Sequence, residues 1–131
     1  MIVLDASALV ELLVASEAGA MVAERLRGTE INAPAHVDAE VVGALRRAVL
    51  GGRLSRYEAV DAVATLGELP IRRWPLTPLN GRTLDYLDVL TVADGYYVVL
   101  AETLEVPLVT CDAPLSRAHG HDAVVELVTP R

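Results

Sequence analysis

The chain of 131 residues contains no lysine, so all eleven of its basic residues are arginine. The absence of lysine excludes a P-loop, because the lysine of that motif binds the nucleotide phosphates. It also excludes Schiff-base chemistry, which needs a lysine amine as the nucleophile. A phosphoacceptor domain built on Asp5 is disfavoured for the same reason, since no lysine could neutralise the aspartyl phosphate.

Cysteine occurs once, at Cys111, so no disulfide can form within the chain and a reducing compartment is expected. No uncharged apolar run approaches the roughly 18 residues that a membrane span needs. The chain starts Met-Ile-Val-Leu-Asp, without the basic start of a signal peptide. We therefore expect a soluble, cytoplasmic protein with no membrane partner.

Positive charge is scarce overall, with a net charge of −7, and an acidic total argues against a nucleic-acid partner. The charge is unevenly distributed, however. Residues 46–82 contain seven arginines and only three acids. An RNA partner therefore stays open, with its phosphates contacted by arginine from this middle segment.

The hydrophobic pattern predicts an α/β domain with a parallel sheet, because short apolar runs alternate with longer helical patterns. The strand runs are apolar at every position, which suits a sheet that is covered on both faces. We expect one domain over residues 1–131. The expected strands are 2–4, 30–34, 71–74, 107–110 and 124–128, and the expected helices are 7–15, 18–27, 37–50, 55–66, 79–90 and 91–104, with a helical turn at 113–118.

Two of the expected strands end in an acidic residue, the first at Asp5 and the fourth at Asp112. In a parallel sheet the ligand crevice lies beyond the carboxyl ends of the strands. We therefore expect the two carboxylates to meet at one edge of the sheet. The simpler alternatives are a helix N-cap for Asp5 and a turn residue for Asp112.

Two further acids lie in apolar helical segments. Asp94 is flanked by residues that look buried, although it could serve only as the acidic partner of Thr91 in a capping box. Glu40 lies beside the apolar stripe of its helix and could equally be a solvated flank. Its neighbour Asp38 is the rival candidate but points about 160° away around the helix.

Several carboxylates in one crevice repel one another and raise each other's pKa. A divalent cation removes that repulsion, and an oxygen-only set of ligands suits Mg²⁺ or Mn²⁺ better than Zn²⁺. Such a cation can polarise a phosphodiester and generate a nucleophilic hydroxide. The hydroxyls of Ser7 and Thr110, next to the strand-end acids, could orient a carboxylate, a water or a phosphate, or serve ordinary capping and turn bonds.

Taken together, these segments resemble the PIN-domain nucleases, and more closely the VapC toxins of type II toxin–antitoxin systems. The resemblance covers nearly the whole chain and rests on the order and spacing of Ile2 to Ser7, Ala39-Glu40, Leu90 to Glu102 and Pro107 to Asp112. One departure is Gly95, where the resembling segment would carry alanine. Glycine inside a helix costs about 1 kcal/mol relative to alanine.

The resemblance implies a PIN-like domain with a five-stranded parallel sheet flanked by helices, an α/β/α sandwich. It implies that Asp5, Glu40, Asp94 and Asp112 form a catalytic metal site for Mg²⁺, with Mn²⁺ as a possible substitute. The implied activity is hydrolysis of RNA phosphodiester bonds by an endoribonuclease toxin. The implied partners are a VapB-type antitoxin and a second copy of the chain.

The helices of residues 36–67 carry more apolar surface than a minimal crossover needs, which suggests a dimer or antitoxin surface, although they could simply pack on the sheet. An alternative to the nuclease is a catalytically inactive PIN-like module that binds RNA or another protein. The stability of the chain with and without Mn²⁺ distinguishes the two, since only a working site is stabilised by the ion.

Overall fold

The computed structural model, which describes residues 1–130, contains a five-stranded parallel sheet with the strand order β3-β2-β1-β4-β5. The strands are short and lie where the sequence predicts them. They are β1 (Ile2–Leu4), β2 (Ile31–Pro34), β3 (Ile71–Trp74), β4 (Leu108–Thr110) and β5 (Val125–Leu127). The expected fold class is therefore confirmed.

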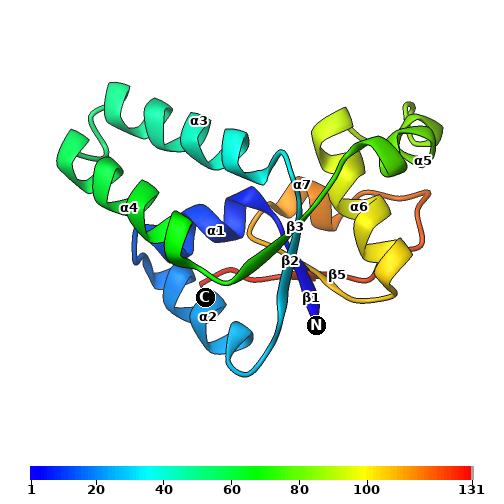
Figure 1. Ribbon diagram of the computed structural model, residues 1–131, viewed down its shortest axis with the longest axis horizontal. Coiled ribbons are helices and arrows are strands. Elements are labelled where there is room, and N and C mark those ends of the chain that lie inside the picture. Colours follow the sequence, from blue (N-terminus) through cyan, green and yellow to red (C-terminus); the bar gives the residue numbers. More distant parts are fainter. Residues whose placement is uncertain (131) are drawn as a thin grey trace.

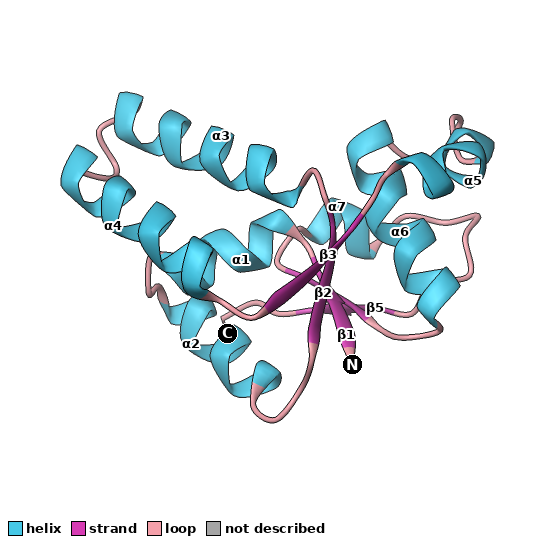
Figure 2. Ribbon diagram, viewed as in Figure 1, coloured by secondary structure: helices cyan, strands magenta, loops and turns pink. Residues whose placement is uncertain are grey.

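Helices lie on both sides of the sheet, with α1 to α4 on one side and α5 and α6 on the other (Figures 1 and 2). Their bounds are α1 (Ala6–Leu13), α2 (Glu17–Leu26), α3 (Val37–Leu50), α4 (Arg56–Glu68), α5 (Asn80–Asp85), α6 (Val92–Leu104) and α7 (Ala113–Ser116), with a 3₁₀ turn η1 at Thr77–Leu79. Within residues 1–130, no single helix is long and apolar enough to cross a membrane; α1 and α2 pass the test of length and composition only as a pair bent by 109°.

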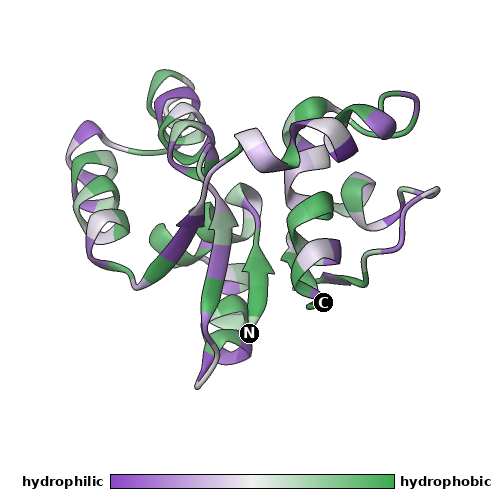
Figure 3. Cartoon of the chain, turned by 45° about the vertical axis from the view of Figure 1, so that its right-hand side comes forward, coloured by the Kyte–Doolittle hydropathy of each residue, from purple (hydrophilic) through white to green (hydrophobic). Residues whose placement is uncertain are grey.

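The core lies between the central strands and the helices on each side. Every residue of β1 and β4 is buried, as the continuous apolar runs predict, whereas the outer strands β3 and β5 are only partly buried. Figure 3 shows the same gradient, with hydrophobic colour concentrated on the inner strands and on the helix faces that cover them. The central strands therefore give the most rigid support for any side chains at their ends.

One expected helix is wrong. Residues 79–90 form the end of η1, the short helix α5 and then a series of turns, with Leu87 and Val89 each donating to the carbonyl three residues earlier. The segment contains Gly81, two aspartates and a threonine, all weak helix formers.

The Thr91 capping box is only half formed. The Thr91 hydroxyl accepts from the Asp94 N–H at 3.2 Å, but no reciprocal bond from Asp94 is present among the described residues. The box at Ser55 and Glu58 is complete, as predicted.

The order in which strands are added to the sheet reverses between β1 and β4. From β1 the chain proceeds outward through β2 to β3, and it then returns to add β4 and β5 on the opposite side of β1. Such a switch point leaves a crevice at the carboxyl ends of the two strands, because the helices that follow them go to opposite sides. Asp5 and Asp112 follow these strands directly or within two residues.

The hairpin formed by α3 and α4 projects from the sheet (Figure 1) and keeps part of its apolar surface exposed. Val42, Val60 and Val63 are 46%, 65% and 43% exposed. These valines line an apolar groove of about 290 Å³ between the two helices. The tip of the hairpin is basic, and four of its arginines are exposed with no ion pair to any residue in 1–130: Arg46, Arg47, Arg53 and Arg56.

The structure explains why glycine occupies position 95. A Cβ added there would lie 2.9 Å from Cγ2 of Thr83, which is 5% exposed in the α5 layer packed on α6. We expect Gly95→Ala to lower stability, since overpacking costs about 1–3 kcal/mol and the gain in helix propensity returns only about 1 kcal/mol. Thermal unfolding of the variant tests this.

Thr83→Ser provides the matched control, because serine lacks the Cγ2 methyl that alanine at position 95 would meet. The double variant Gly95→Ala with Thr83→Ser should recover the melting temperature that the single variant loses. A double variant as unstable as Gly95→Ala alone would show that the crowding lies elsewhere.

Candidate active site

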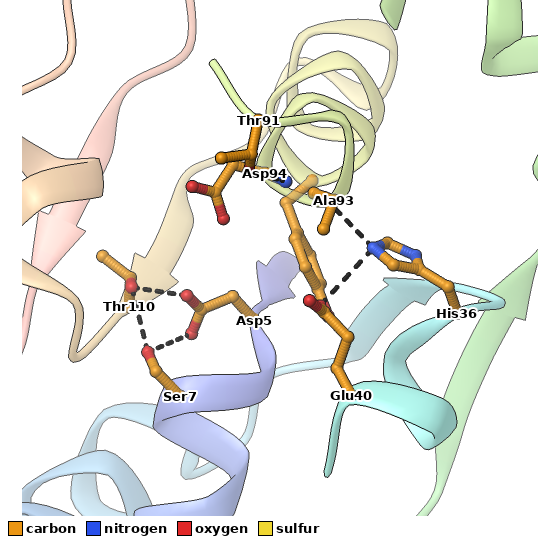
Figure 4. Close-up of polar contacts among 9 residues, drawn as sticks. Asp5, Ser7, His36, Glu40, Thr91, Ala93, Asp94 and Thr110 are labelled. Atoms are coloured by element: carbon orange, nitrogen blue, oxygen red, sulfur yellow. Dashed lines mark hydrogen bonds and ion pairs between the residues drawn. The ribbon is translucent and has the colours of Figure 1, made fainter. Parts of the chain in front are cut away.

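All four predicted site acids line one cavity of about 350 Å³ at the switch point of the sheet. Asp5 follows β1, Glu40 lies on α3, Asp94 on α6 and Asp112 just before α7. Figure 4 shows Asp5, Glu40 and Asp94 approaching the same space from three different elements. The expected meeting of the two strand-end carboxylates is therefore observed, and two helices add a carboxylate each.

Asp5 is both a helix cap and a cavity residue. Its Oδ1 accepts from the Ala8 N–H at 3.0 Å, which makes Asp5 the N-cap of α1. The hydroxyl of Ser7 donates to the same oxygen at 2.8 Å, and the hydroxyl of Thr110 donates to Oδ2 at 2.6 Å. The carboxylate is 4% exposed, so these bonds hold it in one orientation at the wall of the cavity.

The structure shows two of the roles left open for the Ser7 and Thr110 hydroxyls: both orient the Asp5 carboxylate, and both accept bonds from the backbone, the Thr110 bond being an ordinary turn bond. The Ser7 and Thr110 oxygens lie 3.2 Å apart and bracket Asp5 (Figure 4). Each also accepts from the backbone of the β4–α7 connection, Ser7 from the Cys111 N–H and Thr110 from the Asp112 N–H. The hydroxyls therefore tie the two acidic strand ends to each other.

Asp112 is the N-cap of α7 by position, but its side chain accepts no capping bond from the described residues. Its backbone forms two bonds: the N–H donates to the Thr110 hydroxyl, and the carbonyl oxygen accepts from the Ser116 N–H. The carboxylate is half-buried and faces the cavity. Its alternative role as an ordinary turn residue therefore does not account for the side chain.

The structure distinguishes Glu40 from its rival Asp38. Asp38 forms two hydrogen bonds with Arg73, at 2.7 and 2.8 Å, and does not line the cavity. Glu40 faces the cavity, and its Oε1 accepts from the Tyr97 hydroxyl at 2.7 Å. Burial, together with the bond to Glu40, raises the pKa of Tyr97 far above its usual value, so this hydroxyl remains a donor.

His36 connects the two helices that carry Glu40 and Asp94. Its Nε2 lies 3.1 Å from the carbonyl oxygen of Ala93 and 3.5 Å from Oε1 of Glu40 (Figure 4). Because both neighbours are acceptors, Nε2 is assigned the proton. The ring also packs against Tyr97, with the two centroids 4.8 Å apart.

The electrostatics of the cavity show unbalanced negative charge. Burial is the main cause that raises the pKa of Asp5 to about 6. The negative charge of Asp112 raises this pKa further, whereas the hydrogen bonds from Thr110, Ala8 and Ser7 lower it. Burial also raises the pKa of Asp94, helped by the charges of Asp112 and Glu40. Carboxylates with raised pKa values are typical of sites that are completed by a cation or used in proton transfer.

This arrangement fits a hard divalent cation by its chemistry and placement. The donors are carboxylate oxygens, which Mg²⁺ and Mn²⁺ prefer, and the unbalanced charge is of the sign that a cation would neutralise. Within residues 1–130, however, no three acidic, histidine or cysteine side chains already converge to ligand distance. Like charges keep the carboxylates apart, so binding requires their side chains to draw together across the cavity.

Several residues in and around this cavity are not predicted from the sequence. Tyr97 and His36 support Glu40, and Glu11 and Arg47 line the wall. Helical spacing could have found three of them, because Tyr97 follows Asp94 by three residues, Glu11 follows Ser7 by four and Arg47 follows Glu40 by seven. The same spacing also points to His36, which precedes Glu40 by four residues.

A larger hollow of about 560 Å³ lies elsewhere, beside α6 and the segment before β5. Its one deeply buried acid is Glu102, whose side chain is 4% exposed. Glu102 already accepts from Arg82, from the Tyr86 hydroxyl and from the Asp122 N–H. Its charge is therefore satisfied within the protein, and this hollow is not the candidate site.

Comparisons with known proteins identify the family of the chain. The family model described as PIN domain matches residues 2–120. Ribonuclease VapC12 of Mycobacterium tuberculosis is 54% identical over 128 residues, which cover 98% of this chain and 99% of that protein. The crystal structure of M. tuberculosis VapC20, described as a sarcin-ricin loop cleaving toxin, has a TM-score of 0.66 at 20% identity and covers 88% of this chain and 93% of its own. A Pyrobaculum aerophilum protein has a TM-score of 0.67 at 21% identity, with 95% and 87% covered. The chain therefore belongs to the PIN domain family and, within it, to the VapC ribonucleases.

Proposed function

We propose that this protein is a Mg²⁺-dependent endoribonuclease and the toxin of a type II toxin–antitoxin pair. The observation that carries the proposal is the cavity at the switch point, where four carboxylates from separate elements meet with unbalanced charge. Membership of the VapC ribonucleases supports RNA as the substrate and a toxin role. Mn²⁺ is the expected substitute for Mg²⁺.

In this proposal Asp5, Asp94 and Asp112 hold the cation, and Glu40 contributes directly or through a water. A bound cation would polarise the phosphodiester and lower the pKa of a water so that hydroxide forms near neutral pH. The chain supplies orientation: Ser7 and Thr110 fix the Asp5 carboxylate. In the hydrolysis, the water oxygen would bond to phosphorus, the bond to the leaving ribose oxygen would break, and that oxygen would take up a proton from solvent, so the products carry no cyclic phosphate.

Cleavage of a labelled RNA by the purified protein tests the activity. We expect products with Mg²⁺ or Mn²⁺ and none after chelation with EDTA. Cleavage that continues in EDTA, or products that end in a 2′,3′-cyclic phosphate, would contradict the proposal, because the 2′-hydroxyl would then be the nucleophile.

Arg47 is our candidate for the RNA phosphate contact nearest the cation. It is the arginine on the cavity wall, it is exposed, and it forms no ion pair within residues 1–130. Of the other arginines in the basic middle segment, Arg73 and Arg82 are already paired with Asp38 and Glu102, and Arg72 stacks on the Trp74 ring at 4.0 Å, away from the cavity. The expected basic contribution therefore comes from the hairpin tip rather than from the whole segment.

We expect Arg47→Ala to raise KM for RNA while kcat changes little, because the contact holds substrate and transition state alike. The slope of log affinity against log salt should fall in magnitude by about 0.7, the value for one phosphate contact on a single strand. Arg27→Ala is the matched control, since Arg27 is the exposed C-cap residue of α2 and is paired with Glu24 outside the cavity. Equal effects in the two variants would show that only overall charge matters.

We also propose an antitoxin of the VapB type as a protein partner, a homodimer as the state in solution, and the cytoplasm as the location. The exposed valines and the groove of the α3–α4 hairpin support a docking surface there. The mass of the protein in solution, with and without a co-expressed antitoxin, tests the two assemblies.

A further inference from the structure

The geometry around Glu40 carries an inference that rests on the proposed function and extends it. Oε1 of Glu40 is held from two sides, by the Tyr97 hydroxyl at 2.7 Å and by His36 Nε2 at 3.5 Å. No residue among 1–130 donates a hydrogen bond to Oε2. The side chain is 33% exposed on the cavity wall, so it keeps one oxygen engaged and the other available.

Tyr97 is built to hold a fixed position. It is 1% exposed and one of the largest fully buried side chains, so its ring cannot change rotamer without moving the core. It lies one helical turn after Asp94 on α6, whereas Glu40 lies on α3. The hydroxyl therefore couples two acids that come from opposite sides of the sheet, since it fixes Glu40 relative to the helix that carries Asp94.

We infer that Tyr97 is a positioning residue, which holds Glu40 through Oε1 so that Oε2 is the oxygen presented to a cation or to a cation-bound water. Residues that orient a metal ligand in this way commonly contribute about 10- to 100-fold to metal affinity or activity. A carboxylate at 33% exposure without such a bond would sample several rotamers, and fixing one of them would oppose binding.

Tyr97→Phe tests the inference, because it removes one oxygen and leaves the ring in the core. The apparent Mn²⁺ affinity, measured from the melting temperature across a metal titration, should fall by about 10- to 100-fold. Tyr96→Phe is the matched control. Tyr96 is on the same helix, and its hydroxyl donates to Asn80 of α5 outside the cavity, so its loss should leave Mn²⁺ affinity unchanged.

A double-mutant cycle with Glu40→Ala separates positioning from packing. If Tyr97 acts through Glu40, Tyr97→Phe should cause no further loss of Mn²⁺ affinity in the Glu40→Ala protein. An equal loss in both backgrounds, or no loss in the single variant, would overturn the inference. A wild-type protein that binds Mn²⁺ but leaves RNA intact would instead contradict the proposed function, and the comparison of Mn²⁺ affinities would still decide the role of Tyr97.

Discussion

Asp5→Asn should abolish RNA cleavage and leave the fold intact. Loss of a residue that only supports a metal ligand already costs about 10- to 100-fold, so loss of a ligand itself should exceed about 100-fold in kcat/KM. The amide keeps the shape of the carboxylate and can keep its bonds. Its oxygen can accept from Ser7 and from the Ala8 N–H, and the Thr110 hydroxyl can turn to accept from the new NH₂ group. Initial rates of RNA cleavage in Mg²⁺ measure the effect.

Asp61→Asn provides the control for the same chemical change. Asp61 is exposed on α4 and does not line the cavity, so this variant should cleave RNA at the wild-type rate. If Asp5→Asn cleaves RNA as fast as Asp61→Asn, the acid has no part in catalysis. If Asp5→Asn fails to fold without metal, the structural role of the cap outweighs the charge and the expected stability is wrong.

The contribution of Asp5 to the stability of the metal-free protein should fall as the pH rises from about 4 to above 6. The pKa of Asp5 is about 6 in the fold against 3.8 for the free side chain, so the folded state binds more protons between these values. Stability is therefore highest below the lower value and is lost as the pH rises through the upper one. Each pKa unit corresponds to about 1.4 kcal/mol, so the loss from Asp5 approaches about 3 kcal/mol.

The difference in unfolding free energy between wild type and Asp5→Asn isolates this contribution, because every other group titrates in both proteins. Wild type should lose about 2.4 kcal/mol of the full effect relative to the variant between pH 4 and pH 7. Saturating Mn²⁺ should reverse the difference at pH 7, with a gain of about 2.7 kcal/mol when the ion is at 100 times its Kd. A difference that stays constant with pH would show that Asp5 has an ordinary pKa.

The sequence predicts the sheet and the placement of the two strand-end acids well, because both depend on local patterns. The strands are short runs that are apolar throughout, and acids that follow two neighbouring parallel strands must lie at the same end of the sheet. The position of Glu40 beside the apolar stripe of its helix is enough to choose it over Asp38, which points to nearly the opposite face. The structure agrees, since Asp38 is bound to Arg73.

Other features depend on contacts between segments far apart in the chain. Residues 79–90 have apolar spacing typical of a helix, yet Tyr86 and Arg82 both bond to Glu102 and the segment turns to meet α6. Gly95 looks like a weakness until the Thr83 methyl group is placed against it. The bond from Tyr97 to Glu40 spans 57 residues, and no local rule pairs a tyrosine of one helix with a glutamate of another.

The most direct test of the account is the position of Mn²⁺ in a crystal of the protein, located by its anomalous scattering. We predict a peak in the cavity, in contact with the carboxylates of Asp5, Asp94 and Asp112, with Glu40 held by Tyr97 beside it. The same peak should be absent from crystals of Asp5→Asn. Manganese bound elsewhere, or a cavity without it at concentrations that support RNA cleavage, would contradict a carboxylate–metal centre at the switch point.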